Sequence, residues 1–203
     1  TLYPLISFIG PDGAGKSTIV SELKSFLEKN GRNVSVVYAG RGRNHVLPIT
    51  LLGKKYKKFE KEKSTLNQNT TFRRQLLYTL AAPIFTLDLL LRYFLKIMSQ
   101  RMKKMIVITD RYCSDIMLMK HVNFGFKRVL LKLFPKPTLT IYLHNDPEIL
   151  HARRPEEPIP ELERQLQIFD RFKYSLSQKT SDNEKDKKEI SSFVFNYLLK
   201  NWK

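Results

Sequence analysis

The sequence predicts an α/β fold with a doubly wound, mainly parallel, five-stranded sheet flanked by helices. Short apolar runs alternate with segments of helical spacing, and a glycine-rich loop joins the first run to the first helical segment. Strands that alternate with helices form parallel sheets, because each helix returns the chain to the same edge. A chain of 203 residues is long enough for one domain with a sizeable core and too short for two, so we expect a single domain over residues 1–203.

The first part of the chain predicts a strand–loop–helix–strand unit. Pro4–Gly10 is a short apolar run that ends in glycine, which is typical of a buried strand. Helical spacing begins at Lys16 and stops at Asn30-Gly31, and Asn33–Ala39 is the second predicted strand. The crossover of such a unit is right-handed in nearly all proteins. Because the glycine loop directly follows the first strand, we expect it at the carboxyl edge of the sheet, where ligands of doubly wound folds bind.

The middle of the chain is harder to assign. Residues 40–70 are polar and basic, and we expect an acceptor-side or mobile connection there. Thr71–Arg101 predicts one long helix, or two segments that meet near Pro83, because proline interrupts the helical hydrogen bonds. Met105–Thr109 is the third predicted strand, closed by Asp110.

The second half repeats the alternation. Short helices are expected near Ser114 and Phe126, and Thr138–His144 is the fourth predicted strand. Asp146-Pro147 then starts a helix, with proline at its first position, that runs to about Arg153. The remaining predicted elements are a helix over residues 161–174, a short strand over 173–178 and a final helix over 188–202.

The composition limits the setting and the partners. The formal net charge is +17, a field that attracts polyanions, either nucleic acid or nucleotides. The densest basic cluster, residues 54–63, favours a solvated surface over a nucleic-acid site. One cysteine, Cys113, and no visible signal peptide predict a cytoplasmic protein. The apolar stretch Leu76–Met98 is interrupted by Pro83 and by charged residues, so we expect no membrane span and no membrane partner.

The loop from Gly10 to Thr18, here called the phosphate loop, carries the strongest signal. It fits G-x-x-x-x-G-K-[ST] at every fixed position, directly after a strand and at the start of a helix. Its backbone N–H groups and the helix dipole attract phosphates, Lys16 reaches the β- and γ-phosphates, and the Ser17 hydroxyl binds Mg²⁺. The residues expected to bind ATP are Gly10, Asp12, Gly13, Ala14, Gly15, Lys16, Ser17 and Thr18.

A second polar pair follows the third predicted strand. Asp110 stands where enzymes with such a loop keep a carboxylate that holds Mg²⁺ through water, and its alternative, compatible role is a helix N-cap. Arg111 follows it, and its guanidinium would make bidentate contacts to a phosphate. The sequence has no N-K-x-D motif for binding guanine, so a GTPase is a less favoured interpretation. The four histidines and single cysteine show no metal-ligand spacing.

GPDGAGKST, IVITDRY and PTLTIYLHNDPEILHARR together resemble the thymidylate kinase family, discontinuously from about Leu5 to Tyr174. The resemblance implies a P-loop kinase fold with a short lid over about 153–160, the cofactors ATP and Mg²⁺, small nucleotide substrates and transfer to thymidylate. Asp12 matches the acid that contacts the acceptor's sugar. Gly13 stands where some members carry a basic residue, so Arg153 and Arg154, which match the basic start of the lid, should supply the positive charge. The residues expected to carry the reaction are Lys16, Asp110, Arg111, Arg153 and Arg154. We also expect a homodimer.

The acceptor side departs from the family pattern. YAGRGRNHV stands where the family shows T-R-E-P-G-G-T, and FRRQLLYTLAAP replaces the A-D-R segment that helps to bind thymine. The candidate acceptor-binding residues are Asp12, Arg41, Arg43, Phe72, Arg74 and Arg111. Two alternatives therefore remain open. The kinase could act on another acceptor, such as a nucleic-acid end or another metabolite, or the chain could be a nucleotide-binding module with a degenerate acceptor site.

Overall fold

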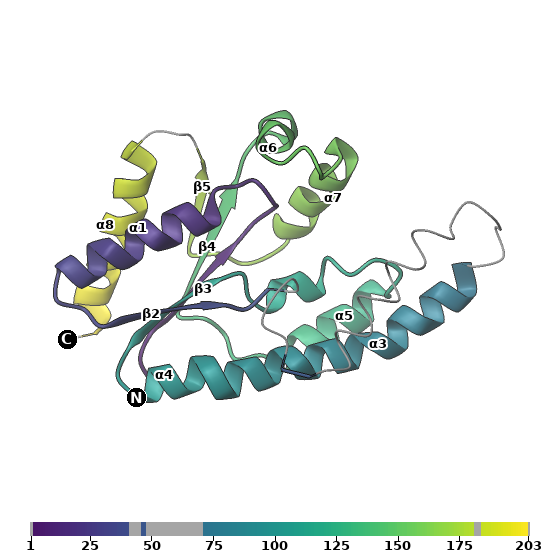
Figure 1. Cartoon of the computed structure of the whole chain (residues 1–203), viewed down its shortest axis with the longest axis horizontal. Coiled ribbons are helices and arrows are strands. Elements are labelled where there is room, and N and C mark those ends of the chain that lie inside the picture. The colour runs from purple at the N-terminus through teal and green to yellow at the C-terminus, as the bar shows by residue number, and fades with distance from the viewer. Residues whose placement is uncertain (1, 41–45, 48–70, 181–183, 203) are drawn as a thin grey trace.

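The computed structural model describes residues 2–40, 46–47, 71–180 and 184–202, without the side chains of residues 71–74, 77 and 184 (Figure 1). Two predicted features therefore lie outside the described residues. One is the connection over residues 48–70 with its basic cluster, and the other is the segment 41–45, which holds two candidate arginines.

The sheet has five strands, all parallel, in the order β2-β3-β1-β4-β5, which confirms the predicted fold class. The strands are β1 Leu5–Ile9, β2 Val34–Tyr38, β3 Ile106–Asp110, β4 Leu139–His144 and β5 Leu176–Lys179. β1 lies in the middle, where Phe8 is in register with Asp110 of β3 and with Ile141 of β4. Because the strands are parallel, their carboxyl ends meet at one edge, and the phosphate loop leaves β1 there.

Helices cover both faces of the sheet (Figure 1). The helical elements are α1 Lys16–Lys29, α3 Thr71–Arg92, a π-helical segment η2 Tyr93–Met98, α4 Ser99–Met102, a 3-10 turn η3 Cys113–Ile116, α5 Phe124–Leu131, α6 Pro147–Arg153, α7 Ile159–Phe169 and α8 Glu184–Asn201. α1 and α8 pack on one face against buried strand residues such as Ile6 and Ile108. α3 and α5 cover the other, against Leu5 and Val107. Alternate residues of one strand thus bury opposite faces, as a doubly covered parallel sheet requires.

Of the two alternatives predicted for residues 71–101, the structure shows the continuous helix at Pro83 and not two segments that meet there. α3 continues through Pro83, and the irregular geometry lies instead at η2, ten residues later. Proline removes one helical hydrogen bond, a loss of about 3 kcal/mol in an isolated helix. Ala82 before the proline and Leu89, Tyr93 and Ile97 after it are buried in one apolar cluster, so packing on both sides holds the helix together.

Other boundaries shift by a few residues. The element near Ser114 is a 3-10 turn of four residues, and α7 ends at Phe169 rather than at 174. β5 occupies Leu176–Lys179, where polar residues alternate between half-buried and exposed, and so the weakest predicted strand does exist. Short polar elements of this kind are defined by their neighbours, because their own sequence carries little apolar periodicity.

A row of apolar side chains on the long helix is exposed. It follows helical spacing from α3 through η2 to α4, and its most exposed members are Leu76, Leu80, Ile84, Leu87, Phe94, Leu95 and Met102. In the part of the chain that the structure describes, no helix has the length and apolar character that a membrane span requires. We call this row the α3 stripe.

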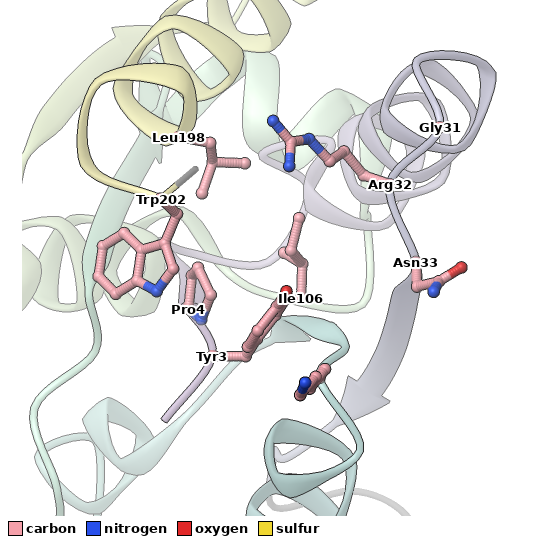
Figure 2. Close-up of a pocket in the computed structure, with 9 residues that line it drawn as sticks. Tyr3, Pro4, Gly31, Arg32, Asn33, Ile106, Leu198 and Trp202 are labelled. Carbon is pink, nitrogen blue, oxygen red and sulfur yellow. The ribbon is translucent and has the colours of Figure 1, made fainter. Parts of the chain in front are cut away.

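Figure 2 shows a small cavity at the amino-terminal edge of the sheet. The phosphate loop lies at the opposite, carboxyl edge. Its volume is about 100 Å³, and Tyr3, Pro4, Arg32, Ile106 and Trp202 contribute to its wall. These residues precede or begin strands or follow helix α8, so the cavity is separate from the edge where β1 and β3 place the predicted site residues.

Candidate active site

The phosphate loop connects β1 to α1 and is held against β4 and α6. Gly10 has a φ of 143°, and a Cβ there would overlap the carbonyl oxygen of Leu143 in β4. Gly13 has a φ of 86°, and its Cβ would lie 2.8 Å from the carbonyl oxygen of Leu150 in α6. Both positions therefore require glycine for conformation and for space.

The amino-terminal end of α1 is open to an approaching anion. Gly15 is the N-cap of α1, and a Cβ built on it would meet nothing within 4 Å. Ser17 and Thr18 in the first turn are exposed, whereas Ala14 is fully buried. Exposed N–H groups at a helix start, with the positive end of the dipole behind them, form a phosphate cradle. The described loop therefore fits a polyphosphate.

Lys16 lies at the centre of this cradle. Its ammonium Nζ donates to the carbonyl oxygens of Gly10 at 3.0 Å and Pro11 at 2.6 Å, and its side chain is buried. Burial lowers the pKa of Lys16 to about 8, against the opposing charges of Asp110 and Asp115, with a smaller lowering from Arg154. A buried ammonium whose hydrogen bonds go to two backbone carbonyls is a strong site for phosphate charge, because the anion restores the charge stabilisation that burial removed.

Ser17 and Asp110 form the pair expected for Mg²⁺. The Ser17 hydroxyl donates to Oδ2 of Asp110 at 2.5 Å, across 93 residues of sequence. Among the residues described, no three histidine, cysteine, aspartate or glutamate side chains form a metal cluster. Mg²⁺ typically takes only one or two protein oxygens and completes its shell with water and substrate phosphates, so this two-oxygen pair fits it. Asp110 belongs to β3 and the next turn is N-capped by Tyr112, so the N-cap alternative is wrong.

Arg111 lies in a strained position beside this pair. Its φ is 68°, which is uncommon for a residue other than glycine and is most often found at functional sites. Its guanidinium forms ion pairs with Asp12 of the phosphate loop and, at 3.3 Å, with the fully buried Asp115. The side chain is thus fixed at the loop, where it can present its remaining donors to a second phosphate.

A cavity of about 260 Å³ opens next to the Ser17–Asp110 pair. It is lined by Ser17, Val20, Ser21, Lys24, Val36, Tyr38 and Asp110, from α1, β2 and β3. Val36 is substantially exposed because β2 is an edge strand. The cavity is large enough for part of a nucleotide and reaches the predicted metal pair directly.

The two arginines predicted for the lid lie at the carboxyl end of α6. Nη1 of Arg153 donates to the carbonyl oxygen of Gly13 at 3.4 Å, which places this guanidinium on the phosphate loop. Arg154 is exposed, and its charge contributes to the lowered pKa of Lys16. Arg153 therefore contacts the loop, and the charge of Arg154 acts on the loop lysine. Residues 154–158 connect α6 to α7, and the lid over about 153–160 stays a prediction.

Some candidates remain untested, and some residues escaped sequence reasoning. Arg41 and Arg43 lie outside the described residues, as do the side chains of Phe72 and Arg74 on α3. The sequence reasoning missed Asp115, which is buried and pairs with Arg111. Their i+4 spacing is no helical signal, because Arg111 has a φ of 68° and lies outside a helix. The sequence reasoning also missed Gln165, whose Oε1 accepts the N–H of Asp12 at 3.3 Å from 153 residues away.

Comparisons with known proteins agree with this geometry. A family model described as thymidylate kinase matches residues 8–191, from β1 into α8. The crystal structure of thymidylate kinase from Ehrlichia chaffeensis is similar over 98% of this chain and 100% of its own, with a TM-score of 0.53 and 18% sequence identity. That likeness shows the shared fold. No curated protein sequence matches the chain.

Proposed function

The chain belongs to the thymidylate kinase family of nucleoside monophosphate kinases, and we propose that it transfers the terminal phosphoryl group of ATP to thymidylate. The observation that carries this proposal is the convergence of Lys16, the Ser17–Asp110 pair and Arg111 at one edge of the sheet. A cradle for one polyphosphate and a fixed guanidinium for a second phosphate are what a phosphoryl transfer between nucleotides needs.

The donor side of the proposed reaction uses the phosphate loop. The backbone N–H groups at the start of α1 and the ammonium of Lys16 bind the β- and γ-phosphates of ATP. Ser17 would hold Mg²⁺ directly and Asp110 through water, and the ion would supply charge neutralisation to the transferring group. Arg153 and Arg154 add positive charge from the lid side of the loop. This charge replaces the basic residue that the loop lacks at Gly13.

The acceptor side uses Arg111. Its ion pairs with Asp12 and Asp115 hold the guanidinium in place before the substrate arrives, which lowers the entropy lost on binding. An acceptor phosphate is already a charged nucleophile, so no general base is required. The cavity between α1 and β2 is lined by Ser17 and Asp110, and we assign it to substrate.

The proposal is tested by ADP release with ATP, Mg²⁺ and a panel of nucleoside monophosphates. Turnover is expected with thymidylate, and a Lys16→Ala variant should lose it together with ATP affinity. Turnover with nucleic-acid ends alone would contradict the acceptor assignment. ATP binding without release for any acceptor would contradict the proposed reaction, and full activity of the Lys16→Ala variant would contradict the loop assignment.

We further propose a cytoplasmic homodimer. The α3 stripe is an exposed apolar surface that runs along three consecutive elements, and contiguous patches of this kind mark interaction sites. Light scattering after gel filtration should give twice the mass of one chain, and a Leu80→Glu variant should give the mass of a monomer. A monomeric parent chain would contradict the dimer. Cell fractionation tests the location, with membrane or secreted recovery as the contrary result.

A further inference from the structure

A buried ion pair on α3 has no place in the proposed transfer step. Asp88 and Arg92 stand one helical turn apart, and both side chains are 0% exposed. Nε of Arg92 donates to Oδ2 of Asp88 at 2.9 Å, and Nη2 donates to the same oxygen. Asp88 is the only acidic residue between Thr71 and Lys104, on an otherwise apolar and basic helix. Burying two charges is costly, and an apolar pair of similar volume would often stabilise a core as well.

An apolar pair could fill the same space, but the Asp88–Arg92 pair also forms hydrogen bonds with the backbone of another segment. Nη1 of Arg92 donates to the carbonyl oxygen of Gly40 at 2.8 Å. Oδ1 of Asp88 accepts the N–H groups of Val46 at 2.8 Å and of Leu47 at 2.7 Å. These contacts anchor the chain immediately before and immediately after residues 41–45.

The charge state of Asp88 agrees with this anchoring. Burial alone would raise the pKa of Asp88, but the N–H of Leu47, the guanidinium of Arg92 and the N–H of Val46 together lower it below its ordinary value. The carboxylate therefore stays ionised, and its two oxygens serve different partners: Oδ2 binds Arg92 and Oδ1 binds the backbone.

Gly40 in turn lies against the proposed acceptor-phosphate residue. A Cβ on Gly40 would overlap Cδ of Arg111 and lie 2.7 Å from Oη of Tyr38. The Arg111 side chain therefore passes directly over the Gly40 backbone, while Asp12 and Asp115 hold its guanidinium. A displacement of Gly40 is transmitted to Arg111 by contact.

We propose that the Asp88–Arg92 pair is a positioning device for the acceptor side of the site, acting through the backbone of Gly40 on the side chain of Arg111. The pair touches no substrate group. The pair fixes the Gly40 backbone, against which the Arg111 side chain packs. Its loss should therefore weaken the binding of the acceptor and leave the binding of ATP unchanged. This inference rests on the proposed function, because it takes Arg111 to bind the acceptor phosphate.

The main test replaces Arg92 by lysine. The ammonium keeps a charged partner for Asp88, but a point charge cannot reproduce the guanidinium fork that reaches Asp88 and Gly40 together. We expect the KM for thymidylate to rise about tenfold or more, because small misplacements at a reacting site are costly, while the KM for ATP changes by less than about twofold. Asp88→Asn keeps an oxygen for the backbone but weakens the hold on Arg92, and it should act in the same direction.

Arg101→Lys is the matched control. Arg101 is also buried on the same helical stretch, where Nε donates to the carbonyl oxygen of Tyr3 at 2.5 Å and Nη1 to the hydroxyl of Tyr93 at 3.0 Å. Both of its partners lie away from the phosphate loop. We expect both Arg92→Lys and this control to lower the melting temperature, and only Arg92→Lys to raise the KM for thymidylate.

Hydrogen–deuterium exchange provides a readout that needs no substrate. Peptides that contain Gly40 and Arg111 should exchange faster in Arg92→Lys than in the parent chain, and Arg101→Lys should leave both unchanged. Unchanged exchange at Arg111, or equal effects on both KM values, would overturn the positioning role. If the parent chain turns over no nucleoside monophosphate, the proposed function fails instead, and the exchange result alone then supports or overturns the link from Arg92 to Arg111.

Discussion

Replacing Lys16 by methionine should measure the free-energy cost of burying the lysine charge in the phosphate loop. In the folded chain, burial lowers the pKa of Lys16 to about 8, whereas an unfolded lysine has a pKa of about 10.4. The difference corresponds to about 3 kcal/mol against the charged form. The two hydrogen bonds from Nζ to Gly10 and Pro11, at about 1 to 3 kcal/mol each, oppose this cost with a free energy of similar size. At pH 7 the variant should therefore be nearly as stable as the parent, although it cannot transfer phosphate.

The direction in which the free energy of unfolding changes with pH is the decisive result. Between the folded and unfolded pKa values of Lys16, the unfolded chain holds a proton that the folded chain has released, so parent stability rises with pH. The methionine variant lacks this proton. From pH 7 to pH 10 the parent should gain about 2 to 3 kcal/mol over the variant, since other titrating groups cancel in the difference.

Urea unfolding of both proteins at several pH values measures this difference. Lys24→Met on the same helix is the control, because its ammonium is exposed and pairs only at 3.7 Å with Glu28. Its stability difference from the parent should change far less over the same range. A flat difference for Lys16→Met would refute the claim that the loop lysine is desolvated in the folded chain.

Three further predictions concern the site. Ser17→Ala should move the Mg²⁺ dependence of turnover to concentrations about tenfold higher or more, because one oxygen ligand is removed, and an unchanged Mg²⁺ titration would contradict that role. Gly10→Ala should cost about 3 kcal/mol or more in urea unfolding, since its Cβ meets Leu143, whereas Gly31→Ala, with a φ of 73° but open space, should cost only about 1 to 2 kcal/mol. Arg153→Ala should lower kcat about 100-fold or more with a small change in the KM for ATP, and the reverse pattern in steady-state kinetics would assign Arg153 to ground-state binding.

The donor half of the site could be predicted from the sequence because its residues are consecutive. The phosphate loop is a continuous segment whose glycines, lysine and serine are fixed by local backbone geometry and by the helix that follows. Asp110 was also predictable, because it closes an apolar strand, and parallel strands bring their carboxyl ends to one edge. The five-stranded fold followed from the same alternation, and the structure confirms it down to the polar strand β5.

The acceptor half depended on contacts that no local pattern encodes. Asp115 and Gln165 reach Arg111 and Asp12 only after the chain has folded, and the Gln165 contact spans 153 residues. The sequence also left open whether the long helix breaks at Pro83, because the long-range packing that outweighs the missing hydrogen bond is not visible in the local pattern.

The fold class, the phosphate loop and the strand-end carboxylate could be read from the sequence, since each depends on a pattern along consecutive residues or elements. The folded structure was needed to show that Arg111 is held between two acids, and that a buried pair on α3 anchors Gly40 beneath it. The orientation and burial of the side chains in such contacts depend on several segments that are distant in the sequence. A desolvated charge acquires its partners, and hence its energy, only when those segments meet.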